Sequence, residues 1–381
     1  MSRGLVAAAV VLYALNLRTL IASLPPLLPE IRADLGLSAT VAGLLTTLPV
    51  VCFGAFAPVV PRLARRVPLE RILVACAVLT VLAAGLRGWD ATAPLFAASL
   101  LAGIAVAAAQ AALPILIRSR FAVATGPLMG AYSMALSLGA TLAAAVAVPL
   151  ADALDGSWSA SLAAWVVPAL PAVVVWPLLA RGAATTLEGP PPEPLRLDPL
   201  AWTVALYFGI QSAGFYAGLA WIPEILVDDG ATETEAGLVQ AVGSLVSMAP
   251  ALAVPILASR LRDQRPILLA IVALATAGAL GLLVAPGSGL AWVVLIGLGQ
   301  GGMLGLALIL PVLRAATPSA VASLTAMALC VGYVVASAGP WILGAVHDLS
   351  GGWSAPLVVL VVITVLQVVP GVHACGNRTL R

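Results

Sequence analysis

Long stretches without a charged residue are the feature that most constrains this chain. They cover 35–61, 72–86, 91–117, 121–151, 156–180, 199–223, 236–259, 266–313, 315–347 and 349–377. A helix needs about 20 apolar residues to cross the hydrocarbon core of a bilayer, so these runs predict membrane-spanning helices. The run 266–313 is long enough for two, with a turn at Pro286-Gly287-Ser288-Gly289. A first span from about Gly4 to Leu28 brings the expected total to twelve transmembrane helices in an all-α membrane protein.

Composition excludes the main alternatives. Of 381 residues, 62% are hydrophobic and only 9% are charged, whereas soluble domains carry roughly 25% charged residues. A net charge of +2 gives no basic surface for nucleic acid. The four cysteines and two histidines lie far apart, so we expect no metal site and no cofactor.

The arginines predict the orientation in the membrane. All 18 basic residues are arginine, and placing the N-terminus in the cytoplasm puts fifteen of them on that side. Arg32 and Arg87 then lie outside, and Arg18 lies within the membrane. We expect a multi-pass protein of the bacterial inner membrane with both termini cytoplasmic, whose first helix is not a cleaved signal peptide.

Two halves are expected on either side of a linker. Residues 181–198 are rich in proline and polar side chains, which is typical of a linker. The predicted organisation is an N-terminal six-helix bundle at 1–180, this cytoplasmic linker, and a C-terminal six-helix bundle at 199–381.

An internal repeat supports these halves. Shifting the chain by 194 residues aligns Pro29-Glu30-Ile31 with Pro223-Glu224-Ile225, and Arg66 with Arg260. The alignment runs without gaps for about forty residues through two loops. Parallel repeats related by an axis along the membrane normal are typical of transporters whose substrate site lies near the midplane.

Arg18 is the ionisable residue expected nearest a bilayer centre. An arginine there costs at least about 2.5 kcal/mol on insertion scales, so it must face the bundle interior and find acceptors. Its planar, permanently charged fork suits small oxyanions and carboxylates. The structural alternative is an arginine satisfied by Asn16 and backbone carbonyls.

Other polar and aromatic side chains at mid-depth are candidates for the wall of a substrate cavity. In the helix that is the repeat mate of the first, Tyr207, Gln211 and Phe215 share one face by their spacing. Any of these groups could instead join helices to one another. The candidate substrate-binding residues are Arg18, Asn16, Tyr207, Gln211, Ser212, Phe215, Gln110, Tyr132, Gln300 and Tyr333.

The repeated loops hold candidate gating residues. Glu30 and Glu224 follow the first helix of each half, and Arg66 and Arg260 follow the second. They are candidates for gate contacts, with a helix cap in water as the simpler interpretation of the two glutamates.

Four segments resemble a known superfamily or one of its branches. The loop APVVPRLARR (57–66) is similar to the Gly-x-x-x-Asp-Arg-x-Gly-Arg-Arg loop of the major facilitator superfamily, with Ala57, Pro61 and Ala64 replacing the glycines and the aspartate. NLRTLIASLPPLLPEI (16–31) resembles the Asn-Leu-Arg-Pro signature of the cyanate porter (CynX/NimT) family, with Thr19 in place of the proline. The segments 207–226 and 331–353 resemble the same branch. The resemblance implies a twelve-helix facilitator fold and a small substrate.

These observations predict a monomeric secondary transporter that moves a small anion (cyanate-like, nitrate-like or a small carboxylate) by alternating access. An exporter of nitroimidazole-like or other neutral drugs is one alternative, and a non-transporting membrane sensor is another. An enzyme is not expected, because no nucleophile–base pair lies at membrane depth. Facilitated diffusion, exchange and proton co-transport are all consistent with the absence of a mid-depth carboxylate.

Overall fold

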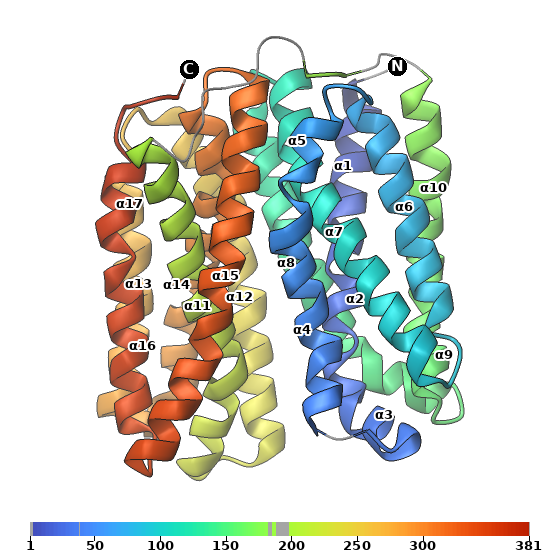
Figure 1. The fold of residues 1–381 in the computed structure, drawn as a ribbon. Helices are drawn as coiled ribbons and strands as arrows, with labels where there is room; N and C mark the ends of the chain where they lie inside the picture. The colour runs from blue at the N-terminus through green and yellow to red at the C-terminus, as the bar shows by residue number, and fades with distance from the viewer. Residues whose placement is uncertain (1–2, 38, 182–184, 188–197, 381) are drawn as a thin grey trace. The chain divides into compact units, whose positions relative to one another are not determined.

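The computed structural model describes residues 3–37, 39–181, 185–187 and 198–380. The described chain is almost entirely helical (Figure 1). Within these ranges the β-type pairing is an isolated bridge between Ala315 and Leu380. The expected all-α architecture is therefore confirmed.

The chain divides into two compact units. The first comprises residues 1–122 and 135–191, and the second comprises 123–134 and 192–381. The division between 191 and 192 lies within the expected linker, most of which, at 182–184 and 188–197, lies outside the described residues.

The helices of the first half differ widely in length, because several spans are interrupted. They are α1 (Arg3–Leu17), α2 (Thr19–Ala22), the 3-10 helix η1 (Pro25–Leu27), α3 (Leu28–Leu35), α4 (Ala39–Phe56), α5 (Val59–Leu63), α6 (Leu69–Leu86), α7 (Thr92–Arg120), α8 (Thr125–Ala153), α9 (Trp158–Ala164) and α10 (Val166–Ala180).

The second half has longer unbroken helices. They are α11 (Pro199–Asp228), α12 (Glu233–Arg260), α13 (Arg265–Val284), the 3-10 helix η3 (Pro286–Ser288), α14 (Gly289–Arg314), α15 (Pro318–Ser350), α16 (Ser354–Leu366) and α17 (Val368–Ala374).

The helices account for the predicted spans. Ten helical segments of the described chain are long and apolar enough to cross a membrane. The other two expected spans correspond to α4, whose apolar segment Leu44–Phe56 is shorter, and to α11, which is 30 residues long but carries many polar and aromatic side chains. The turn expected near Pro286 is η3.

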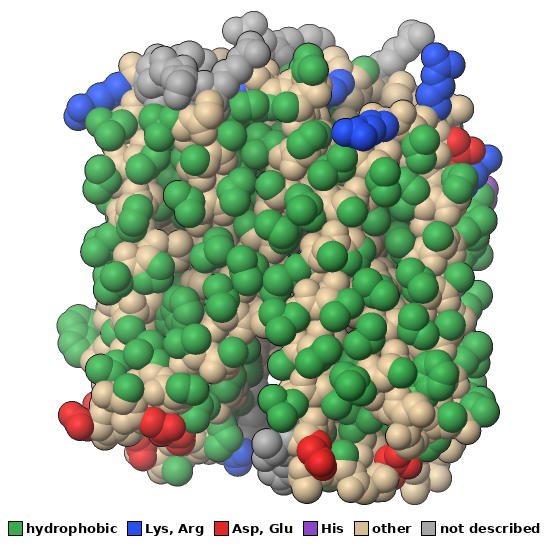
Figure 2. Space-filling model, turned by 180° about the vertical axis from the view of Figure 1, so that it is seen from behind, with side chains coloured by type: hydrophobic (Ala, Val, Ile, Leu, Met, Phe, Trp, Pro, Cys, Tyr) green, Lys and Arg blue, Asp and Glu red, His purple; other side chains and the backbone are tan. Residues whose placement is uncertain are grey.

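The type of exposed side chain changes along the helix axes. On the face drawn in Figure 2, hydrophobic side chains cover the middle of the helices, arginines gather at one end, and most aspartates and glutamates lie at the other. We call the end of each unit that carries the arginines its arginine-rich end; it holds Arg62, Arg66, Arg118 and Arg120 in the first unit and Arg260, Arg262, Arg265 and Arg314 in the second. A wide apolar band between charged ends is what a bilayer requires of its proteins.

The first span is not the continuous helix expected from the sequence, because it breaks at Arg18. Helix α1 ends at Leu17 and α2 begins at Thr19. The Thr19 hydroxyl donates to the Asn16 carbonyl at 2.8 Å, a back-bond that bends helices. Pro25 and Pro26 then supply no backbone N–H for the carbonyls one turn earlier.

Small residues allow some helices to pack closely. A Cβ added at Gly139 of α8 would lie 1.9 Å from the carbonyl oxygen of Leu15 in α1, and one at Gly301 of α14 would lie 1.9 Å from that of Ser247 in α12. Only glycine permits such contacts between backbones.

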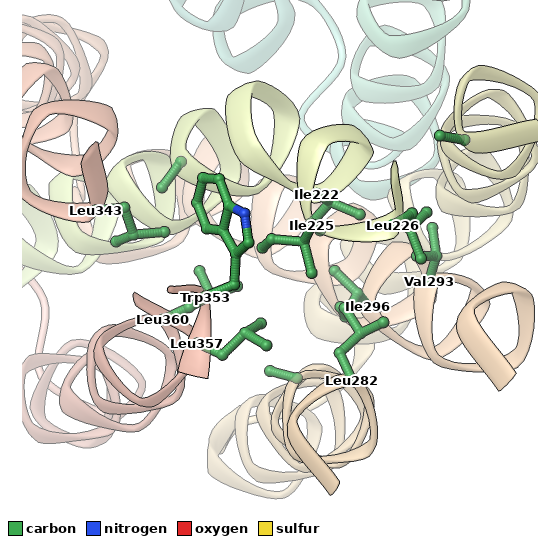
Figure 3. Close-up of a cluster of buried hydrophobic side chains, with 13 residues drawn as sticks. Ile222, Ile225, Leu226, Leu282, Val293, Ile296, Leu343, Trp353, Leu357 and Leu360 are labelled. Carbon is green, nitrogen blue, oxygen red and sulfur yellow. The ribbon is translucent and has the colours of Figure 1, made fainter. Parts of the chain in front are cut away.

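A buried apolar cluster joins the helices of the second unit. Figure 3 shows Ile222, Ile225 and Leu226 of α11 facing side chains from α13, α14 and α16, with Trp353 beside them. This cluster packs the C-terminal end of α11 against its neighbours in the second unit.

Candidate functional site

Arg18 occupies the break in the first span. Its side chain is partly exposed, and its guanidinium carbon lies 5.9 Å from the centroid of the Phe53 ring of α4. A guanidinium at this distance over an aromatic face is attracted to it electrostatically. The break therefore presents a cation part-way along a membrane span, steadied by an aromatic ring.

Asn16 holds the helix that carries Arg18. Its side chain is 6% exposed, and its Nδ2 donates to the Pro168 carbonyl of α10 at 2.7 Å. Its Oδ1 is buried without a hydrogen-bond partner among the described residues. The amide nitrogen thus joins α1 to α10, and the amide oxygen remains available as an acceptor.

The candidates on α11 lie in a continuous helix. Ser212, the repeat equivalent of Arg18, is inside α11, so the break of the first half has no counterpart here. The Ser212 hydroxyl donates to Gln211 Oε1 at 3.2 Å. The Tyr207 hydroxyl donates to the Met303 carbonyl of α14 at 3.4 Å, and Phe215 packs edge-on against Tyr216 with ring centroids 5.4 Å apart.

The structure brings Gln300 but not Tyr333 to the Tyr207 side of α11. Gln300 of α14 has its Nε2 3.6 Å from the position that a Cβ on Gly214 would take. Its Oε1 is buried and, within the described chain, makes no hydrogen bond. Tyr333 lies on α15 and packs edge-on against Phe208 at 5.6 Å, on a different interface of α11.

Of the remaining candidates, two are buried and four are exposed. Gln110 of α7 and Tyr132 of α8 are both buried, Gln110 in the first unit and Tyr132 in the part of α8 that groups with the second. Glu30, Glu224, Arg66 and Arg260 are exposed at helix ends. In the part of the chain that the structure describes, none of these four forms an ion pair, and their gating role stays a prediction.

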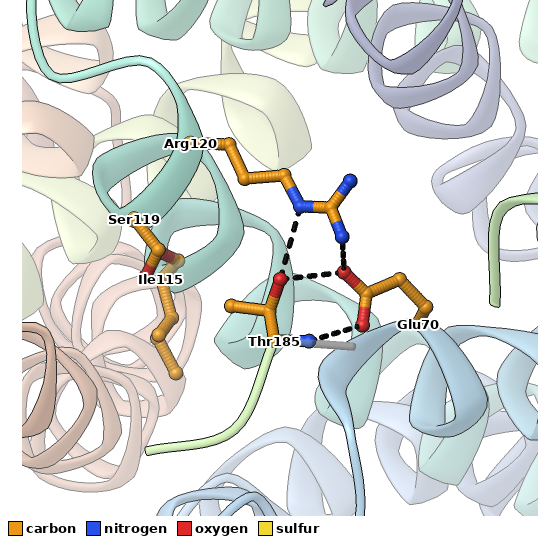
Figure 4. Close-up of polar contacts among 5 residues, drawn as sticks. All are labelled: Glu70, Ile115, Ser119, Arg120 and Thr185. Atoms are coloured by element: carbon orange, nitrogen blue, oxygen red, sulfur yellow. Dashed lines mark hydrogen bonds and ion pairs between the residues drawn. The ribbon is translucent and has the colours of Figure 1, made fainter. Parts of the chain in front are cut away.

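A polar network that sequence reasoning missed lies at the arginine-rich end of the first unit (Figure 4). Glu70 at the start of α6 is 1% exposed and accepts from Arg120 Nη2 at 2.5 Å. Thr185 donates to the same carboxylate from its hydroxyl at 2.6 Å and from its backbone N–H at 3.0 Å. Arg120 Nε in turn donates to the Thr185 hydroxyl at 2.9 Å.

Two backbone hydrogen bonds extend this contact. The Leu69 N–H donates to the Thr185 carbonyl, and the Leu187 N–H donates to the Ala64 carbonyl, both at 2.9 Å. Residues 185–187 therefore dock on the first unit rather than only tethering it. The sequence signal for this network is the place of Glu70, a lone carboxylate between Arg66 and Arg71 at the start of a predicted span.

Together these features define a multi-pass helical membrane protein with a polar, interrupted first span. The sequence model described as the Major Facilitator Superfamily matches residues 6–340, so the chain belongs to that superfamily.

Two relatives and one solved structure agree with this assignment. The 2-nitroimidazole transporter of Escherichia coli is 32% identical, with 100% of this chain and 98% of the relative covered. The cyanate transport protein CynX of the same organism is 32% identical, with 90% of each chain covered. The structure of the proton:xylose symporter XylE superposes with a TM-score of 0.76 at 15% identity, covering 99% of this chain and 97% of that one. The resemblance to the cyanate porter family and the facilitator fold are thereby confirmed, and the protein is a transporter.

Proposed function

We propose that this transporter moves a small anion across the membrane by alternating access, and that the anion binds at Arg18. The observation that carries the proposal is the position of Arg18, at the break between α1 and α2 within the span Gly4–Leu35. Intramembrane charges are costly and usually mark substrate or ion pathways.

Helix breaks are where transporters of other families bind ligands, because unwound backbone offers polar groups at membrane depth. Here the break also lies beside the buried Oδ1 of Asn16 and the ring of Phe53. The ring and the hydrogen bond from Asn16 to Pro168 restrict the motion of the segment, so the guanidinium is preorganised for a planar oxyanion or cyanate-like anion.

The names of the relatives support a small substrate. One is a cyanate transport protein and another a 2-nitroimidazole transporter. The arginine-rich end of each unit would face the cytoplasm of a bacterial cell.

The experiment is uptake into proteoliposomes. Labelled cyanate, nitrate and formate are offered to wild type, Arg18→Lys and Arg18→Ala, with Arg32→Gln as the matched control because Arg32 is an exposed arginine of the same span. Two charge-assisted hydrogen bonds are worth about 1.5–3 kcal/mol each, so Arg18→Ala should lower uptake by roughly 100-fold or more. Arg18→Lys keeps the charge but loses the fork and should be intermediate. Wild-type uptake that survives in Arg18→Ala would refute the proposal.

A neutral nitroimidazole-like substrate is the second candidate. The full-length similarity to a 2-nitroimidazole transporter favours it. So do two aromatic pairs, Phe215–Tyr216 within α11 and Phe208 of α11 with Tyr333 of α15. In that case transport of the neutral compound would persist in Arg18→Ala and fall in Phe215→Ala.

A further inference from the structure

The two halves repeat one polar arrangement with a change of charge. Glu70 and Gln264 are 194 residues apart, as are Arg120 and Arg314. Arg120 pairs with a carboxylate at 2.5 Å, whereas Arg314 Nη2 donates to the neutral amide oxygen of Gln264.

Arg314 is more deeply buried than its counterpart. Whereas Arg120 is only partly buried, Arg314 is buried, with 4% of the residue exposed. Its Nε donates to the Ala374 carbonyl at 2.6 Å, and among the described residues no acceptor pairs with Nη1. Both of its hydrogen-bond partners are neutral oxygens. The Asp263 carboxylate acts on it electrostatically but, among the described residues, makes no ion pair with it, and a buried guanidinium without a paired counter-charge is costly.

Two carboxylates at the same end of the second unit are paired with other arginines. The Asp263 carboxylate is exposed; it accepts from the Arg265 backbone N–H at 3.0 Å and lies 3.9 Å from the Arg265 side chain. Asp198 pairs with Arg378 at 3.2 Å. The neighbouring Cys375 thiol is buried, which raises its pKa to about 12, so it carries no negative charge at neutral pH.

Gln264 is held in place by its own bonds. Its Nε2 donates to the carbonyls of Ala258 at 3.0 Å and Leu261 at 2.6 Å. This orientation directs the Gln264 amide oxygen, a neutral acceptor, toward Arg314.

An open surface cavity of about 400 Å³ lies beside this arginine, lined by Leu261, Arg262, Gln264, Leu313, Arg314 and Asn377. It is large enough to hold a phosphate group while remaining open to solvent. Arg262 and Asn377 are exposed, so the cavity offers two guanidinium groups and side-chain amides, and none of the described residues that line it is acidic.

We infer that this cavity binds a phosphate group, carried either by a soluble phosphate or by an anionic phospholipid. Guanidinium forks bind phosphate through paired hydrogen bonds. The site lies where α13 begins and α14 ends, at the level of a membrane interface where basic pockets bind lipid headgroups. The bound phosphate supplies for Arg314 the negative charge that Glu70 supplies for Arg120. This site is separate from Arg18 and does not depend on the proposed substrate.

The test uses the whole protein in nanodiscs of phosphatidylcholine. Inorganic phosphate is titrated by calorimetry at constant ionic strength, and retained phosphatidylglycerol is counted by native mass spectrometry after reconstitution in mixed lipid. Phosphate binding identifies the soluble source, and retention of one phosphatidylglycerol identifies the lipid.

Two exposed substitutions probe the cavity without disturbing the buried bonds. Arg262→Gln removes a donor and Asn377→Asp adds a negative charge, so each should weaken binding by about tenfold or more. Arg71→Gln is the control, because Arg71 is an exposed arginine of the first unit, and it should leave binding unchanged. The inference is overturned if wild type binds neither probe, or if Arg71→Gln weakens binding as much as Arg262→Gln does.

Discussion

Replacing Glu70 with alanine should release residues 185–187 from the first unit. The substitution removes the acceptor of three hydrogen bonds, one from Arg120 and two from Thr185. Breaking a buried ion pair by removing one partner costs about 3–5 kcal/mol. Because the Arg120 side chain is 18% exposed and can be rehydrated, we expect about 3 kcal/mol.

Hydrogen exchange measures this loss directly. The N–H groups of Leu69 and Leu187 exchange only when the docked segment opens, because each donates to a backbone carbonyl across the contact. A loss of about 3 kcal/mol corresponds to exchange roughly 100-fold faster at these two positions. Glu70→Gln keeps a neutral acceptor and should accelerate exchange about tenfold.

Glu30→Ala is the matched control, since Glu30 is an exposed carboxylate of the same unit. It should leave the exchange of Leu69 and Leu187 unchanged. If Glu70→Ala alters their exchange by less than about threefold, the network does not hold the segment and the reasoning fails.

Two further predictions concern packing and thiol reactivity. Gly139→Ala should lower stability in detergent by about 1–3 kcal/mol, because its Cβ would lie 1.9 Å from the Leu15 carbonyl oxygen. Gly85→Ala is the control and should have little effect, since its Cβ would meet no atom within 4 Å. Equal melting temperatures for the two variants would contradict the close packing at Gly139. Cys375 has a pKa raised by burial from 9.0 to about 12, so alkylation of the folded protein should be negligible at pH 8 and stability should fall as the pH rises from 9 toward 12. Rapid labelling of Cys375 by a maleimide at pH 8, measured by mass spectrometry, would show that the thiol is not buried.

The helical spans and the fold could be predicted because they depend on properties that each segment carries by itself. Apolar runs such as 266–313 determine where the chain can cross a membrane, and the turn near Pro286 follows from local backbone preferences. The repeat is likewise visible without coordinates, because loop charges and prolines align at one offset.

The contacts of the candidate site depend on distant segments and could not be predicted in this way. Asn16 donates to Pro168, a carbonyl 152 residues away. Arg87, which was expected on the outer side, is 1% exposed and donates from Nη1 to the Leu20 carbonyl, a contact that the sequence does not reveal. The position of a residue along a membrane-spanning helix can be counted from the sequence. Whether a side chain at the helix end points into the bundle or into solvent depends on neighbours from distant segments. The docking of Thr185 was missed for the same reason.

The docked segments also show where this polypeptide could be divided. Thr185 and Leu187 pair with the first unit, and Leu380 pairs with the backbone at Arg314 and Ala316 in the second. A cut placed after Leu187 would keep the hydrogen bonds of Thr185 and Leu187 within the N-terminal fragment and those of Leu380 within the C-terminal fragment. Two co-expressed pieces divided at that point are therefore a practical route to labelling one half of the transporter independently of the other.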